Sequence, residues 1–163
     1  GLVEVMSGTI SVSSREEVGS CFTLHIPCTA CDAPAEGVSA ERLPPSLHIL
    51  LAEDNDINAQ IIQSMLSESD AHCVWVVNGA EAVEAVSRQA FDLVLMDIQM
   101  PDMDGYESTR IIKSQKPDLP IIAQTAYAMS GELELSKEAG CDAYISKPIK
   151  IEHLFQTMGD YLK

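Results

Sequence analysis

The stretch Asp92–Gly105 (DLVLMDIQMPDMDG) gives the clearest indication of the fold. It opens with a short apolar run, Leu93–Met96, that ends at the carboxylate of Asp97 and continues into a segment rich in Pro, Asp and Gly. A short apolar run bounded by turn residues is typical of a strand that is buried on both faces of a parallel sheet. The stretch therefore predicts a buried strand with an acidic residue at its carboxyl end.

Similar apolar runs recur on both sides of this stretch, at Leu47–Ala52, Cys73–Val77, Ile121–Ala123 and Ala143–Ile145. Segments with helical spacing lie between them. Two of these helices are predicted over Gly105–Gln115 and Ser130–Ala139. Strands that alternate with helices predict an α/β fold with a doubly wound, five-stranded parallel sheet covered by helices on both faces.

Three predicted helices each carry an apolar face. The first face holds Ile57, Ile61, Met65 and Leu66, the second holds Val83, Val86 and Ala90, and the last holds Ile151, Leu154, Phe155, Met158 and Leu162.

The composition excludes several classes of protein. The formal net charge of −15 and the ten scattered basic residues argue against a nucleic-acid partner, which needs clustered Lys and Arg. No apolar run approaches the roughly 18 residues of a membrane span, and the first ten residues do not resemble a signal peptide. We therefore expect a cytoplasmic chain, or the cytoplasmic part of a larger protein.

The cysteines predict neither a disulfide framework nor a metal site. There are five, with irregular spacing, and the pair Cys28 and Cys31 has no second Cys or His pair at zinc-site spacing. The segment 29–46 is rich in Pro and small residues and predicts a linker. It divides the chain into a short piece, 1–28, and a long piece, 47–163.

Polar residues follow four of the five apolar runs. They are Glu53 and Asp54, Asp97, Thr125, and Lys147. Because ligands bind at the carboxyl ends of the strands in an open parallel sheet, we expect these five side chains to share one pocket. Each one alone would also fit a helix cap or a turn, but capping does not account for the whole set.

The chemistry of this set indicates Mg²⁺ and a phosphoryl group. Two like charges about 4 Å apart repel by roughly 4 kcal/mol at an effective dielectric near 20, so three carboxylates must gather a cation or a proton. Oxygen-only ligands favour Mg²⁺. An aspartate beside Mg²⁺ can attack phosphorus, and a lysine can neutralise the oxygens of the transferring group.

Four motifs resemble the signatures of response regulator receiver domains. They are Leu50–Asn55 (LLAEDN), Asp92–Gly105, Ala123–Ala126 (AQTA) and Ser146–Pro148 (SKP). Asn58 resembles in particular the receivers of hybrid sensor histidine kinases. The resemblance spans 47–163 and implies a flavodoxin-like strand order, 2-1-3-4-5. Gln124 departs from it, because the family usually has an apolar residue before the threonine.

The resemblance also implies a role for each position. Asp97 would be the phosphorylation site, Asp54 would bind Mg²⁺ directly, and Glu53 would bind it mainly through water. The backbone carbonyl of Gln99 would complete the metal ligands, and Lys147 would pair with the phosphoryl group.

The family further implies a switch. Thr125 would move toward the phosphoryl group as the ring of Tyr144 turns inward, and the surface of the fourth helix, fifth strand and fifth helix would report the change. Gln99 and Tyr127 would help to set the lifetime of the phosphorylated state. A cis peptide bond between Lys147 and Pro148 is also implied.

The N-terminal piece predicts two short strands, Thr9–Ser13 and Phe22–Ile26, around a turn at Ser14–Ser20, with the end of a helix near Val3–Met6. It resembles the C-terminal remnant of a histidine kinase ATP-binding domain, without that domain's nucleotide-binding motifs. We therefore expect it neither to bind ATP nor to fold alone. It would be loosely ordered, docked on the receiver, or paired with another copy.

Three functions compete. A receiver would accept a phosphoryl group from a histidine kinase phosphodonor domain or exchange it with a histidine phosphotransfer protein, and would not be an independent enzyme. A phosphatase of the haloacid dehalogenase type needs a second aspartate at position 99, where this chain has Gln99. A degenerate binding module would not need the full polar set. The resemblance is compatible with a membrane-anchored parent protein and with a homodimer.

The run Asp102–Gly105 superficially resembles a calcium loop. In that register Met100 and Ile111 would have to be ligands, and neither can bind calcium.

Overall fold

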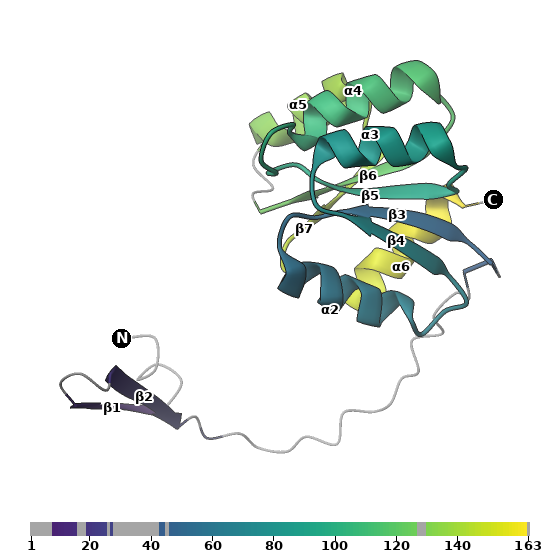
Figure 1. Ribbon diagram of the computed structural model, residues 1–163. Coiled ribbons are helices and arrows are strands. Elements are labelled where there is room, and N and C mark those ends of the chain that lie inside the picture. The colour runs from purple at the N-terminus through teal and green to yellow at the C-terminus, as the bar shows by residue number, and fades with distance from the viewer. Residues whose placement is uncertain are drawn as a thin grey trace. The chain divides into compact units, whose positions relative to one another are not determined.

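The computed structural model describes residues 8–15, 19–25, 27, 43–44, 46–126 and 130–162. Contacts divide the chain into two units, Gly1–Glu36 and Gly37–Lys163, and Figure 1 shows both. The helix end predicted near Val3–Met6, most of the predicted linker, and Tyr127 lie outside the described residues.

The larger unit is built on a parallel sheet of five strands. They are β3 (His48–Ala52), β4 (His72–Val76), β5 (Leu93–Asp97), β6 (Ile121–Thr125) and β7 (Ala143–Ser146). Their order across the sheet is β4-β3-β5-β6-β7. Counted within this unit, that is the order 2-1-3-4-5, so the predicted flavodoxin-like fold is confirmed.

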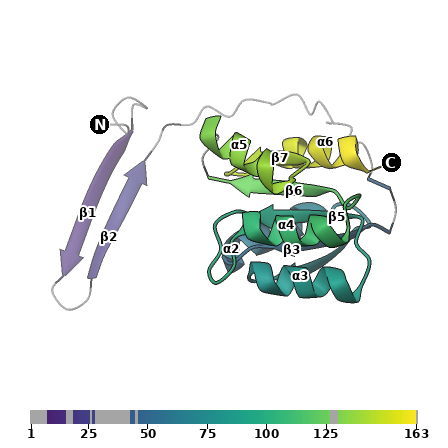
Figure 2. The same ribbon diagram turned by 90° about the horizontal axis from the view of Figure 1, so that it is seen from above.

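Five helices cover the two faces of this sheet (Figures 1 and 2). They are α2 (Asp56–Leu66), α3 (Gly79–Arg88), α4 (Gly105–Gln115), α5 (Ser130–Ala139) and α6 (Ile151–Tyr161). One apolar core packs α2 and α6 against one face of the sheet, and a second packs α3 and α4 against the other. Strand β5 contributes Leu93 and Leu95 to the first core and Val94 and Met96 to the second, as alternation requires.

The helices α2, α3 and α4 are capped by residues other than the acids that directly follow β3. The side chain of Asn55 caps α2 by accepting hydrogen bonds from the backbone amides of Ile57 and Asn58. Asn78 caps α3 and Asp104 caps α4 in the same way. Asp54 is therefore not the cap of α2, which was the alternative explanation for its position.

The predicted apolar face of α2 is wrong in part. Ile57 and Ile61 are 63% and 49% exposed, and the buried residues are Ala59, Ile62 and Leu66. Both sets fit a helical spacing, so the period alone cannot choose between them.

The predicted face of α3 also needs correction, whereas that of α6 is confirmed. In α3 the buried residues are Gly79, Ala82 and Val86, and the exposed Ala90 lies beyond the end of the helix. In α6 the predicted stripe packs into the core through Leu154, Phe155 and Met158, with Ile151 and Leu162 partly buried beside them.

The smaller unit contains a hairpin of two antiparallel strands, β1 (Thr9–Arg15) and β2 (Gly19–His25). Both predicted strands are confirmed, and they run further toward the turn than predicted. Ile10, Val12 and Phe22 are 62%, 61% and 71% exposed. Val12 pairs with Phe22, so these apolar side chains share one face of the hairpin, and that face is solvent-exposed.

Among the helices in the described part of the chain, none has the length and hydrophobicity that crossing a membrane requires.

Candidate functional site

The parallel direction of the strands brings the predicted site residues to one edge of the larger sheet. Asp97 and Thr125 are the last residues of β5 and β6. Glu53 and Asp54 directly follow β3, and Lys147 directly follows β7. The predicted convergence at one edge is therefore what the structure contains.

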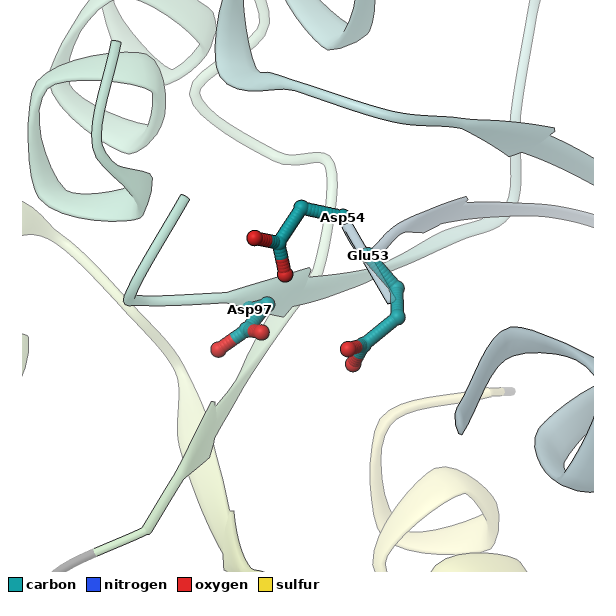
Figure 3. A group of neighbouring side chains, drawn as sticks. All are labelled: Glu53, Asp54 and Asp97. Atoms are coloured by element: carbon teal, nitrogen blue, oxygen red, sulfur yellow. The ribbon is translucent and has the colours of Figure 1, made fainter. Parts of the chain in front are cut away.

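Three carboxylates form a tight cluster at this edge. One oxygen from each of Glu53, Asp54 and Asp97 lies within 4.8 Å of the corresponding oxygens of the other two. Figure 3 shows the three side chains at the ends of two neighbouring strands. Glu53 is completely buried, Asp97 is 5% exposed and Asp54 is exposed, so the cluster reaches solvent on the side of Asp54.

The ammonium of Lys147 joins two of these carboxylates. Its Nζ atom donates to Oε2 of Glu53 and to Oδ2 of Asp97, each at 2.7 Å. Burial by itself would lower the pKa of Lys147, but the hydrogen bonds and charges of Asp97 and Glu53 outweigh it and raise that pKa above its ordinary value. Lys147 is therefore a fixed positive charge at neutral pH.

Asp97 has its second oxygen in a separate hydrogen bond. Its Oδ1 atom accepts from the backbone N–H of Gln99 at 3.1 Å, while the Gln99 residue itself is exposed. Burial raises the pKa of the Asp97 carboxyl, the hydrogen bond from Lys147 opposes the rise, and the charge of Glu53 adds to it. The carboxyl is thus held between a cation and another acid.

Besides Lys147, two residues whose contacts the sequence did not indicate hold Glu53. Its Oε1 atom accepts from Nδ2 of Asn58 at 3.0 Å, and its backbone carbonyl accepts from the indole N–H of Trp75 at 2.8 Å. Asn58 lies on the first turn of α2, five residues after Glu53, and this spacing could have suggested the contact. No sequence signal pointed to Trp75.

The donor set fits a hard divalent cation. All the candidate ligands are oxygens, which favours Mg²⁺ or Ca²⁺ over zinc. Three carboxylates and one ammonium leave two negative charges uncompensated when all four groups are ionised. A divalent cation would balance that charge, and the exposed Asp54 would give it access.

The turn after Asp97 folds back onto the strand that carries the acid. The backbone N–H of Gly105 donates to the carbonyl of Ile98 at 3.0 Å. A Cβ atom on Gly105 would lie 2.2 Å from the Asp97 carbonyl oxygen, so only glycine fits here. Asp104 caps α4 and Asp102 has a φ of 66°, which confirms a tight turn in place of a calcium loop.

The two predicted switch residues lie on neighbouring strands. Thr125 is 5% exposed at the end of β6 and pairs with Ser146 of β7. Tyr144, two residues earlier on β7, is 41% exposed. The peptide bond between Lys147 and Pro148 is cis, as the resemblance implied.

Comparison with known proteins agrees with this geometry. Residues 49–158 match the response regulator receiver domain family. The chain is 36% identical over 116 residues to the polar-differentiation response regulator DivK of Brucella anthropi. This match covers 70% of this chain and 94% of DivK. The chain is also 38% identical over 159 residues to the autoinducer 2 sensor kinase/phosphatase LuxQ of Vibrio vulnificus, a match that covers 94% of this chain. That match spans only 19% of the length of LuxQ.

Solved structures show the same fold. The receiver domain of sensor histidine kinase PA1611 from Pseudomonas aeruginosa, with a magnesium ion coordinated in its active-site cleft, is 37% identical with a TM-score of 0.68. The match covers 72% of this chain and 98% of that one. The receiver domain of Ssk1 from Saccharomyces cerevisiae, in complex with the histidine phosphotransfer protein Ypd1, is 25% identical with a TM-score of 0.69, over 72% and 90% of the two chains.

Proposed function

This chain belongs to the response regulator receiver domain family of two-component signalling, and on that premise we propose that it accepts a phosphoryl group on Asp97 in a Mg²⁺-dependent reaction. The observation that carries the proposal is the placement of the Asp97 carboxylate. It lies within reach of the ammonium of Lys147 and of a solvent-accessible acidic cluster.

The transfer forms one bond and breaks another. A carboxylate oxygen of Asp97 attacks the phosphorus of a phosphohistidine, a P–O bond forms, and the P–N bond breaks with its electron pair returning to the imidazole. Lys147 neutralises an oxygen of the transferring group from its position 2.7 Å from Asp97. The domain assists its own phosphorylation and dephosphorylation and is not an independent enzyme.

The metal would be held by carboxylates and by one backbone group. Asp54 and Asp97 would bind it directly, Glu53 through water, and the carbonyl of Gln99 would add a fourth protein group. When bound, Mg²⁺ supplies positive charge to the phosphoryl oxygens. The magnesium ion in the receiver of PA1611 supports this assignment.

The output would be read on the surface of α5, β7 and α6, the fourth helix, fifth strand and fifth helix of this unit. Thr125 would bond the phosphoryl group, and the Tyr144 ring would then turn from its half-exposed position toward the space that Thr125 leaves. This surface would carry the phosphorylation signal to the next protein.

Intact-mass spectrometry tests the proposal. The protein is treated with acetyl phosphate with and without Mg²⁺. We expect one added phosphoryl group that requires Mg²⁺ and that is absent from Asp97→Asn. Sustained release of phosphate with no phosphorylated protein detected would indicate a phosphatase, and an unchanged mass with no phosphate release would indicate a degenerate binding module. Either result would contradict the proposal.

The phosphodonor or phosphoacceptor partner would be a domain that presents a histidine. Ile57 and Ile61 of α2 are exposed, and Ile61 lines a cavity of about 110 Å³. The cavity is lined by Asn58, Ile61, Ile62, Lys147, Pro148 and Ile149. This apolar surface borders the Asp97 site through Asn58 and Lys147, and the complex of Ssk1 with Ypd1 supports such a partner.

A charge placed on this surface tests the docking proposal. Ile61→Asp should slow phosphorylation by a phosphohistidine domain at least about tenfold, because it places a charge in an apolar interface. Phosphorylation by acetyl phosphate should stay within twofold of the wild-type rate. Equal slowing with both donors would show that the substitution damages the site instead of the docking surface.

We further propose that residues 1–28 are the C-terminal remnant of a kinase ATP-binding domain, 29–46 a linker whose Leu43 packs on the receiver core, and 47–163 the receiver. The exposed apolar face of the hairpin supports this, because such a face would pack against the rest of a larger domain. The match to LuxQ, which covers 94% of this chain, also supports it. The parent protein would then be a hybrid sensor kinase whose receiver works in the cytoplasm.

A further inference from the structure

The side chain of Gln124 occupies a buried position beside the site. It is completely buried, and neither its amide oxygen nor its amide nitrogen has a hydrogen-bond partner among the described residues. A buried amide without partners is less stable than an apolar side chain of the same shape, because it loses its hydrogen bonds to water and gains none. In this state of the molecule, Gln124 therefore makes the folded protein less stable than an apolar residue at position 124 would.

The register of the sheet places this amide next to the phosphorylation site. Gln124 pairs with Asp97 on β5 and with Ile145 on β7. Alternation along the strands puts Gln124 on the same face as Ile122, and Asp97 on the same face as Leu95. Ile122 and Leu95 both belong to the core under α2 and α6, so Gln124 and Asp97 are neighbours on that face.

Lys147 must pass over this position to reach its partners. It follows β7, whereas the carboxylates that it binds belong to β5 and to the segment after β3. Strand β6 lies between β7 and β5 in the sheet. The aliphatic part of Lys147 therefore crosses the end of β6, where Gln124 is the residue on the α2/α6 face.

Lys147 hydrogen-bonds Glu53 and Asp97 in this state, and Gln124 is not among its partners. Two of the three ammonium donors are used by Glu53 and Asp97. Loading the site with Mg²⁺ and a phosphoryl group, as in the function proposed above, would draw both carboxylates toward the metal. The ammonium would then keep the phosphoryl oxygen as one acceptor and have donors left for another.

We propose that Gln124 is a positioning residue for Lys147, whose amide oxygen accepts a hydrogen bond from the ammonium when the site is loaded. Its amide nitrogen then faces the carboxyl of Asp97, its neighbour in the register. The amide thus favours the loaded state over the unloaded one, and an apolar side chain at 124 would have the opposite preference.

Two measurements on one set of variants test this inference, which rests on the proposed function. Beryllofluoride with Mg²⁺ serves as the probe of the loaded state, and the fluorescence of the single tryptophan, Trp75, reports binding because its indole contacts Glu53. Urea unfolding without Mg²⁺ reports the stability of the unloaded state. The variants are Gln124→Met, which keeps the length of the side chain, and Ile145→Val as a packing control.

The inference predicts opposite effects on the two states. In Gln124→Met the urea midpoint should stay the same or rise, while the beryllofluoride concentration at half-saturation should rise about tenfold, as expected for a lost hydrogen bond to a charged group. Ile145→Val should lower the urea midpoint and leave half-saturation within twofold of wild type.

Every other result overturns the inference. A lower urea midpoint in Gln124→Met would show that the amide already has a partner in the unloaded state. An unchanged half-saturation, or an equal change in Ile145→Val, would show that the amide does not act on the loaded site. If the wild-type protein bound no beryllofluoride, the proposed function itself would be wrong, and the inference with it.

Discussion

Asp54 differs from the other two acids of the cluster because it is the exposed one. Glu53 and Asp97 share the ammonium of Lys147, whereas no hydrogen bond or ion pair from Lys147 reaches Asp54 among the described residues. An exposed carboxylate that lies within 4.8 Å of two buried ones is the natural entry point for a cation.

Replacing this residue should therefore weaken metal binding with little effect on folding. Asp54→Asn should weaken Mg²⁺ binding at least about tenfold, since the loss of even an indirect partner of a bound metal typically costs that much. Titration of Trp75 fluorescence with MgCl₂ measures the affinity. Asp102→Asn is the matched control, because Asp102 is an exposed acid outside the cluster, and its Mg²⁺ affinity should equal that of wild type.

Among the elements, α4 is locked to the site by its first residue. Gly105 packs on the backbone of Asp97 and Ile98, and the nearest atoms belong to the main chain, so they cannot rotate away. Gly105→Ala should lower the free energy of unfolding by roughly 1–3 kcal/mol, the usual cost of overpacking. Urea unfolding measures this, and Ser114→Ala, at an exposed position of the same helix, should change it by less than about 0.5 kcal/mol. If Gly105→Ala left the free energy of unfolding unchanged, the turn would not be packed against the backbone of Asp97 and Ile98.

The edge strand β4 carries a pH-dependent group. Burial raises the pKa of the Cys73 thiol from 9.0 to about 11, so its protonated form is favoured in the folded protein. The thiol thus contributes stability that is present below pH 9 and is lost as the pH rises toward 11.

Because the thiolate is the nucleophile, iodoacetamide at pH 8 should label the exposed Cys21 much faster than Cys73, with equal rates in urea. Fast labelling of Cys73 in the folded protein would contradict its burial.

At the scale of the whole molecule, the start of the receiver unit can be located by its core. Leu43 lies in the predicted linker, yet it is 8% exposed and packs with the core under α2 and α6. A chain that begins at Leu43 should keep the urea midpoint of the complete receiver unit. For a chain that begins at Leu47, the free energy of unfolding should be lower by roughly 1.5–3 kcal/mol, the contribution of a buried leucine. Equal stability of the two chains would show that Leu43 does not belong to the core.

The sequence predicted what depends on period and strand direction. Five apolar runs became five parallel strands, and the residues that follow Ala52, Met96, Ala123 and Ile145 met at one edge. It did not predict what depends on packing. Two helical stripes compete on α2, and only the three-dimensional fit selects Ala59 over Ile57. Contacts between distant residues, such as the indole of Trp75 with Glu53, leave no local pattern to read.

Asp97, and no other acid of the cluster, should receive the phosphoryl group. Reduction with borohydride converts an aspartyl phosphate to homoserine, which peptide mass spectrometry can locate. After treatment with acetyl phosphate and Mg²⁺, we expect homoserine at position 97 and unmodified Glu53 and Asp54. Homoserine at position 54, or a phosphorylated protein in which Asp97 is unchanged, would contradict it.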